Sequence, residues 1–185
     1  MSAISGHFAM TVKNALLAFL FLVSGTVFAA VDSGYRMGSG DVLSVNVFNE
    51  PDLTFEKISL NDTGILSFPL IGDIEAKGHT VSEVSKMITD KLNDGYVKNP
   101  RVTVSVAAYR PFYIGGEVKK PGGYPYQPGL NVRAAIALAE GKTDRGSDRR
   151  ITIIRAADAS KEPQPAKLDD PVSPGDTITI EQGFF

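Results

Sequence analysis

The chain has 185 residues, a formal net charge of -2, 43% hydrophobic and 22% charged residues, and no cysteine. These proportions are typical of a globular protein and argue against disorder, and the near-neutral charge gives no electrostatic basis for a nucleic-acid partner. Without cysteine we expect no disulfide, no thiolate metal site and no lipid-modified N-terminal cysteine.

The N-terminal segment has the three parts of a secretory signal peptide. Lys13 is its only charged residue, and the apolar run 15–23 follows. Val27 and Ala29 then supply small residues at positions -3 and -1 of a cleavage site. The apolar run is too short to span a bilayer stably as a helix. We therefore expect a signal peptide over 1–29 and secretion into the periplasm, the alternative being a buried N-terminal helix.

The first half of the remaining chain predicts several strands. Alternating apolar and polar residues favour half-buried strands over 41–48 and 101–107. Residues 61–64, Asn-Asp-Thr-Gly, are a strong turn signal because Asn, Asp and Gly tolerate positive φ. Shorter strands are predicted at 57–60, 65–70 and 74–76.

A single helix is predicted in this half, over 80–92. Thr80 and Glu83 have the spacing of a capping box, in which the two side chains satisfy each other's backbone N–H groups. Gly95 suits a left-handed stop. One face of the helix is apolar, and its members are Val81, Val84, Ile88 and Leu92.

The second half repeats the order of strands, helix and strands after a seam at Arg110-Pro111. Strands are predicted at 112–118, from 124, at 149–155 and at 177–181, with a helix over 132–140 capped by Asn131. Residues 156–166 read as a polar loop. The sequence therefore predicts an α+β fold of two small modules, 30–109 and 110–185, behind the signal peptide 1–29.

Groups that could carry catalysis are sparse. His79 is the only histidine after the predicted signal peptide, and no Gly-x-Ser-x-Gly motif is present. Carboxylates such as Asp41, Asp62 and Asp94 fall at turn or cap positions, which explains them without chemistry. A catalytic carboxylate pair for glycoside hydrolysis is the alternative. We expect no catalytic residue and no enzyme activity.

Two further motifs resemble ligand sites only in part. Residues 38–43, Gly-Ser-Gly-Asp-Val-Leu, lack the third glycine of a dinucleotide loop and precede a strand. Asp169-Asp170 lacks the additional oxygen ligands that calcium needs. We expect neither a cofactor nor a metal.

Some basic and aromatic residues of the second half could contact a glycan. Basic pairs can face an acidic polymer, although they are more often simply solvated. Aromatic faces can stack on sugar rings, although alternation in a strand puts about half of them in a core. The candidates are Lys119, Lys120, Tyr124, Tyr126, Arg149 and Arg150.

The order of motifs resembles a known family. Residues 35–45, Tyr-Arg-Met-Gly-Ser-Gly-Asp-Val-Leu-Ser-Val, resemble the opening Y-x-I/L-G-x-G-D-x-L-x-V of the polysaccharide export (Wza-type) family. The second half resembles the SLBB domain, a β-grasp-like module found beside it. The family-motif residues, which we expect to be structural, are Gly40, Asp41, Gly64, Pro69, Gly72 and Pro100 in the first half and Gly115, Val118, Pro121, Gly122, Pro174, Gly175 and Asp176 in the second.

The resemblance implies a non-catalytic, ring-forming part of the conduit that carries capsule or exopolysaccharide across the periplasm and outer membrane. It also implies contact with an inner-membrane polysaccharide co-polymerase. Longer relatives carry a C-terminal amphipathic helix that spans the outer membrane, whereas here only 182–185 follow the last predicted strand. We therefore expect a separate outer-membrane β-barrel as partner.

Two other functions stay open. A soluble periplasmic protein that binds a glycan, or regulates in response to one, would use the second module for its ligand and could be a monomer. An enzyme acting on the glycan would turn polysaccharide over. Oligomeric state separates the export protein from the binding protein, because only the export protein needs a ring.

Overall fold

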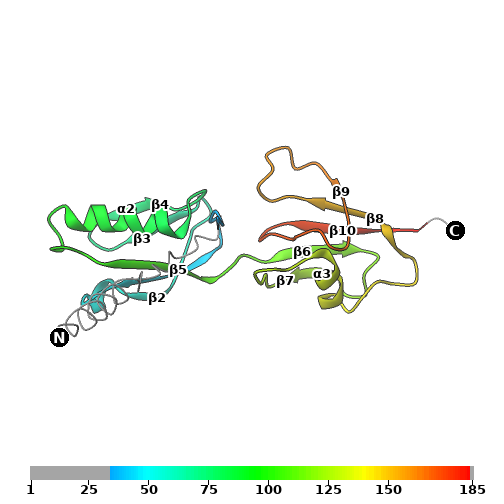
Figure 1. Cartoon of the computed structure of the whole chain (residues 1–185), viewed down its shortest axis with the longest axis horizontal. Helices are drawn as coiled ribbons and strands as arrows, with labels where there is room; N and C mark the ends of the chain where they lie inside the picture. Colours follow the sequence, from blue (N-terminus) through cyan, green and yellow to red (C-terminus); the bar gives the residue numbers. More distant parts are fainter. Residues whose placement is uncertain (1–33, 184–185) are drawn as a thin grey trace, which may run out of the picture. The chain divides into compact units, whose positions relative to one another are not determined.

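The computed structural model describes residues 34–183, which belong to one unit, Asp32–Phe185. The predicted signal peptide and its cleavage site lie outside the described residues. Strands exceed helices in the described chain, and each of its two α-helices accompanies a sheet, so the fold is α+β as predicted (Figure 1).

The first sheet has three antiparallel strands in the order β2-β1-β5, and they are β1 (Val42–Val47), β2 (Phe55–Ser59) and β5 (Val102–Ala108). Leu43, Val45 and Val47 are buried on one face of β1, and the residues between them are more exposed, as the alternation predicted. A short 3-10 turn, η2 (Pro51–Leu53), links β1 to β2.

A hairpin and a helix complete the first core. The hairpin joins β3 (Ile65–Phe68) to β4 (Gly72–Glu75), and β3 ends two residues earlier than predicted because Leu70 turns the chain with a φ of 67°. The helix α2 (Val81–Asn93) begins at the predicted capping box, with both reciprocal hydrogen bonds present. Its buried face is formed by Val84, Ile88 and Leu92.

The second sheet has five strands in the order β7-β6-β10-β8-β9. In this order β10 lies between β6 and β8 at the centre of the sheet. The β6–β10 pair is parallel, and the other pairs of this sheet are antiparallel. The strands are β6 (Phe112–Gly116), β7 (Gly122–Tyr124), β8 (Gly146–Ile154), β9 (Gln164–Ala166) and β10 (Thr177–Gln182). The helix α3 (Val132–Leu138) is capped by Asn131, whose side chain accepts from the Ala134 N–H at 2.9 Å.

Several details of the second sheet differ from the sequence-based expectation. The return strand expected from Tyr124 is β7, which ends at that residue, and β8 begins at Gly146 instead of residue 149. The strand expected over 112–118 ends at Gly116, where a φ of 77° takes the backbone out of the extended region. The loop expected over 156–166 contains β9, which pairs with β8 at the edge of the sheet. Pro165 fits there because an edge strand tolerates a missing N–H donor.

The buried apolar side chains form two separate clusters. One contains residues from Met37 to Val104, and the other contains residues from Phe112 to Ile180. No residue belongs to both. The boundary between residues 109 and 110 remains a prediction, which these clusters agree with.

Candidate functional site

The Gly-Asp step before β1 is held by a buried carboxylate. The side chain of Asp41 is fully buried. Its Oδ2 accepts hydrogen bonds from the Gly38 N–H at 2.8 Å and the Tyr35 hydroxyl at 2.5 Å. Its Oδ1 accepts from the Arg110 N–H at 2.9 Å, and the guanidinium of Arg110 lies 3.3 Å from Oδ2. Each carboxylate oxygen is thus satisfied, and the buried charge is paired.

The Gly-Asp step before β10 repeats this arrangement. Asp176 is buried, and its Oδ2 accepts from the Ser173 N–H at 2.9 Å and from Arg155 at 3.0 Å. Its Oδ1 accepts from the Ala156 N–H at 2.8 Å. In both copies the aspartate binds the N–H three residues before it. It also binds an arginine that follows the antiparallel neighbour, β5 or β8. We call each copy an Asp-Arg clasp.

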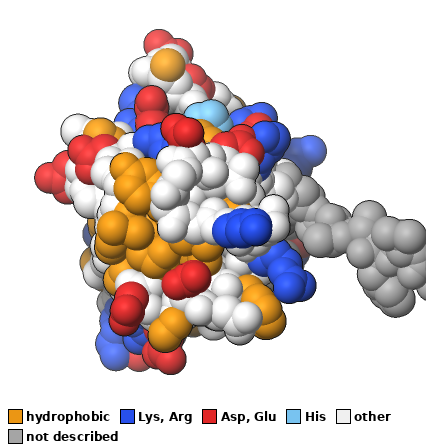
Figure 2. All heavy atoms as spheres, turned by 90° about the vertical axis from the view of Figure 1, so that its left-hand side faces the viewer, with side chains coloured by type: hydrophobic (Ala, Val, Ile, Leu, Met, Phe, Trp, Pro, Cys, Tyr) orange, Lys and Arg blue, Asp and Glu red, His pale blue; other side chains and the backbone are white. Residues whose placement is uncertain are grey.

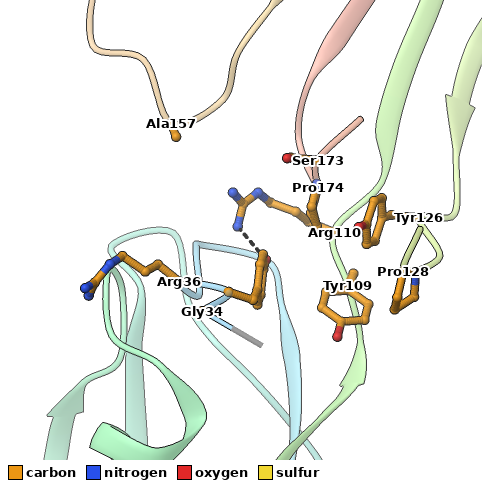
Figure 3. Close-up of a pocket in the computed structure, with 10 residues that line it drawn as sticks. Gly34, Arg36, Tyr109, Arg110, Tyr126, Pro128, Ala157, Ser173 and Pro174 are labelled. Atoms are coloured by element: carbon orange, nitrogen blue, oxygen red, sulfur yellow. Dashed lines mark hydrogen bonds between the residues drawn. The ribbon is translucent and has the colours of Figure 1, made fainter. Parts of the chain in front are cut away.

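Arg110 lies close to both Gly-Asp turns. A Cβ at Gly38 would stand 2.0 Å from its Nη1, and a Cβ at Gly175 would stand 2.7 Å from its Nε. Because glycine has no Cβ, both positions leave room for the side chain of Arg110. Arg110 also donates to the Tyr35 hydroxyl at 3.1 Å, the bond drawn in Figure 3.

Three half-buried tyrosines form a chain of edge-to-face contacts beside Arg110. The ring centroids of Tyr35 and Tyr109 are 5.0 Å apart, and those of Tyr109 and Tyr126 are 5.3 Å apart. Burial, with help from the hydrogen bond to Asp41, raises the pKa of Tyr35 far above its ordinary range. Burial also raises the pKa of Tyr126. Both phenols therefore keep their protons at neutral pH.

The three tyrosines line a pocket of about 510 Å³, which we call the tyrosine pocket. Pro128 and Pro174 add apolar surface to it, and Ser173 adds a hydroxyl. Figure 3 shows Tyr109, Tyr126 and Pro128 on one side, with the guanidinium of Arg110 beyond them. Pockets of this size, with mostly apolar walls and a few polar groups, are typical of small-ligand sites. Within residues 34–183 no group of acidic or histidine side chains could hold a metal ion.

The glycan-contact candidates fall into three groups by their contacts. Tyr126 lies in the tyrosine pocket. Lys120 forms an ion pair with Glu140 at 2.5 Å, and its carbonyl accepts from the Tyr124 hydroxyl at 2.7 Å, so these two residues are neighbours. Lys119 is exposed next to them in the chain.

The other two candidates lie on β8. Arg149 is exposed, and Arg150 forms an ion pair with Glu181 at 2.5 Å and donates to the Gln182 carbonyl. Since Arg150 is engaged by β10, its charge is less available to an acidic polymer than the sequence suggested.

The remaining chemical candidates have structural partners. His79 lies 3.3 Å from the carboxylate of Glu83 in the capping box of α2. Asp169 pairs with Arg133 at 3.0 Å, and Asp170 accepts from the Lys167 N–H at 2.8 Å. These contacts explain the three residues without a bound cation.

One face of the molecule gathers hydrophobic side chains inside a border of acidic and basic ones, as Figure 2 shows. Among the described residues, loops of the first module expose three large hydrophobic side chains, Phe48, Leu70 and Tyr96, each by more than half. Arg101 covers the ring of Phe48 at 4.6 Å. Neither α2 nor α3 is long and apolar enough to span a membrane.

Both modules match known sequence families. Residues 29–107 match the family model described as polysaccharide biosynthesis/export protein, and residues 111–164 match the SLBB domain. The two matches follow each other in the chain. The first includes the Gly-Asp motif before β1, and the second includes β6, β7 and β8 but ends before the Gly-Asp motif of β10.

Similar curated proteins carry names from exopolysaccharide production and export. The exopolysaccharide production protein ExoF of Rhizobium meliloti is 37% identical over 161 residues, which cover 80% of this chain and 38% of ExoF. The EPS I polysaccharide export outer membrane protein EpsA of Ralstonia nicotianae is 30% identical, over 80% of this chain and 47% of EpsA. EpsA of Ralstonia solanacearum is 29% identical, over 80% and 48%. The chain thus spans less than half the length of each.

Proposed function

Because this chain belongs to the polysaccharide export family and carries one SLBB domain, we propose that it is a non-catalytic component of a bacterial exopolysaccharide export conduit. The observation that carries the proposal is the succession of the two family matches, 29–107 and then 111–164, in one chain. The names of the two EpsA relatives, which include polysaccharide export and the outer membrane, support this role, and the name of ExoF supports a part in exopolysaccharide production. We further propose a periplasmic location.

The proposal includes a homo-oligomeric ring, in which several copies of the chain surround a common passage. The apolar face in Figure 2 and the exposed side chains of Phe48, Leu70 and Tyr96 support it, because large exposed apolar surfaces often mark protein contacts. An inner-membrane polysaccharide co-polymerase and an outer-membrane β-barrel are the proposed neighbours of the ring.

Deletion of the gene in its host tests the export role. We expect cell-surface and secreted polysaccharide to fall sharply and to return when the chain is supplied in trans. Wild-type secretion by the deletion strain would contradict the proposal. A strain that expresses the Ile88→Asp variant, whose first module should not fold, is the matched control because it supplies the chain without its structure.

The mass of the native complex tests the ring. Chemical cross-linking in cells followed by mass measurement should give a multiple of the 19.8 kDa chain, corrected for any cleaved signal peptide. A species that stays monomeric at cellular concentration would instead favour the second candidate, a soluble glycan-binding protein. The tyrosine pocket is the observation that favours this second candidate.

A further inference from the structure

The walls of the tyrosine pocket suit a ring with apolar faces. Tyr35 and Tyr126 each make one edge-to-face contact within the tyrosine chain, so neither ring is covered on both faces by another tyrosine. Tyr109 and Tyr126 are only half-buried. A pyranose ring presents C–H groups on its faces, and an aromatic face carries the negative potential that attracts them.

Polar groups at the pocket match the edge of such a ring. In the described part of the chain, neither the Tyr109 hydroxyl nor the Ser173 hydroxyl forms a hydrogen bond with the protein, and both residues line the pocket. A hydroxyl both donates and accepts, as the hydroxyls of a sugar do. Two such groups beside an aromatic wall can therefore bind the edge of a sugar while its face rests on a tyrosine.

The charges at the pocket are already paired. Arg110 is neutralised by the buried carboxylate of Asp41 at 3.3 Å. Arg36 lies 3.7 Å from Glu83 and donates to the Gly78 carbonyl, and in Figure 3 its side chain points away from the tyrosines. An anionic sugar would find no unpaired cation among the described lining residues, so the pocket favours an uncharged ring.

We infer that the tyrosine pocket binds one uncharged pyranose unit of the polysaccharide, stacked on Tyr126 and hydrogen-bonded by the Tyr109 and Ser173 hydroxyls. The volume of about 510 Å³ falls in the range of small-ligand pockets. This inference rests on the proposed function, because that function supplies the polymer. In this proposal the pocket binds the polysaccharide transiently while the polymer passes through the conduit.

Nuclear magnetic resonance of the full secreted chain tests the inference directly. The probes are methyl β-D-glucopyranoside, methyl β-D-galactopyranoside and methyl α-D-mannopyranoside, with methyl β-D-glucuronide as the anionic counterpart. We expect saturation transfer to at least one neutral glycoside and shifts of the Tyr109 and Tyr126 ring signals. Absence of transfer and shifts for all three neutral probes at saturating concentration would overturn the inference.

Three variants give the test its controls. Tyr109→Ala should weaken binding about tenfold, because it removes a hydroxyl that binds the sugar and a ring that packs against Tyr126. Ser173→Ala removes only an exposed hydroxyl, leaves the fold intact and should weaken binding about threefold. Tyr113→Ala removes a tyrosine of β6 that is 50% exposed outside the pocket, and it should leave binding unchanged. Equal affinity in all three variants, or tighter binding of the glucuronide, would overturn the inference.

The outcome of the sugar-binding test can be distinguished from the outcome of the export test. If the deletion strain loses export but the pure protein binds no glycoside, the sugar site fails and the export role stands. If the deletion strain exports normally, the export role fails whatever the pocket binds. A Tyr109→Ala strain with normal protein level and reduced export would support both together.

Discussion

Asp41 accepts hydrogen bonds through both oxygens while it is fully buried, so its replacement has a defined cost. Asp41→Asn would place an amide N–H against the backbone N–H groups or the guanidinium of Arg110. We expect a loss of about 3 kcal/mol in the free energy of unfolding, as for other buried pairs that lose one charge. Urea unfolding would measure it.

Asp62→Asn is the matched control for this change, because Asp62 lies in an exposed turn and only its backbone carbonyl accepts a bond. It should change stability by less than about 0.5 kcal/mol. Equal effects at the two positions would contradict the clasp as described.

Gly116 offers a second test within a single strand. Its φ is 77°, and a Cβ there would stand 2.2 Å from the carbonyl oxygen of Ile180. Gly115, its neighbour, has ordinary φ and no atom within 4 Å of a Cβ. We expect Gly116→Ala to destabilise by more than about 2 kcal/mol and Gly115→Ala to be nearly neutral in thermal unfolding. A well-folded Gly116→Ala protein would show that the β6–β10 spacing is not fixed.

At the scale of elements, the capping box of α2 makes stability depend on pH. The hydrogen bond from the Thr80 N–H, with Arg36 nearby, lowers the pKa of Glu83 below its ordinary 4.5. A lowered folded-state pKa stabilises above the unfolded-state value, and this contribution is lost as pH falls through the folded-state value. The melting temperature should therefore separate wild type from Glu83→Gln at about pH 6, and the gap should close below pH 4.5. A gap that stays constant with pH would contradict this.

The buried face of α2 is tested by one charge. Ile88 is fully buried and lies on the face of α2 that joins the first core. Ile88→Asp would bury an unpaired carboxylate, which costs several kcal/mol, so we expect the first module to unfold. Ser82→Asp is the control, because Ser82 is exposed in the first turn, where an acid is favoured. Circular dichroism of both proteins would check the expectation.

Local patterns predicted most of these elements because they depend on neighbours in the chain. The alternation in β1 and the Thr80–Glu83 spacing each have a local cause, and both were confirmed. β9 was missed because Pro165 disfavours a strand, and only pairing with β8 makes it one. The Asp-Arg clasps were missed because Asp41 and Arg110 are distant in sequence. The signal in the sequence that could have indicated the clasps was a Gly-Asp pair before one strand together with an arginine after another.

The candidate site was predicted only in part for the same reason. Tyr126 was among the glycan candidates, but Tyr35 and Tyr109 were not, since nothing local distinguishes them from core aromatics. The basic candidates were chosen as pairs of neighbours in the chain, whereas the residues that line the pocket come from positions 34 to 174. Only the folded chain places the three rings together.

At the scale of the whole molecule, the two apolar clusters predict separable unfolding. Ile178 is fully buried in the second cluster, so Ile178→Ala should destabilise that part by about 2–5 kcal/mol. Hydrogen exchange should then speed up in β6, β8 and β10 but not in α2. Equal loss of protection in α2 would show that residues 34–183 unfold as one cooperative unit.

The central place of β10 has a consequence for biosynthesis. β6 and β8 are made first, yet neither pairs with the other, and each needs β10 as its neighbour. The second core therefore cannot close until residues 177–182 have been synthesised, whereas α2, β1 and β5 can assemble earlier. During that interval the apolar residues of β6 and β8 stay open to proteases and chaperones. A premature stop before Thr177 would therefore remove the second module's fold as a whole rather than trim its edge.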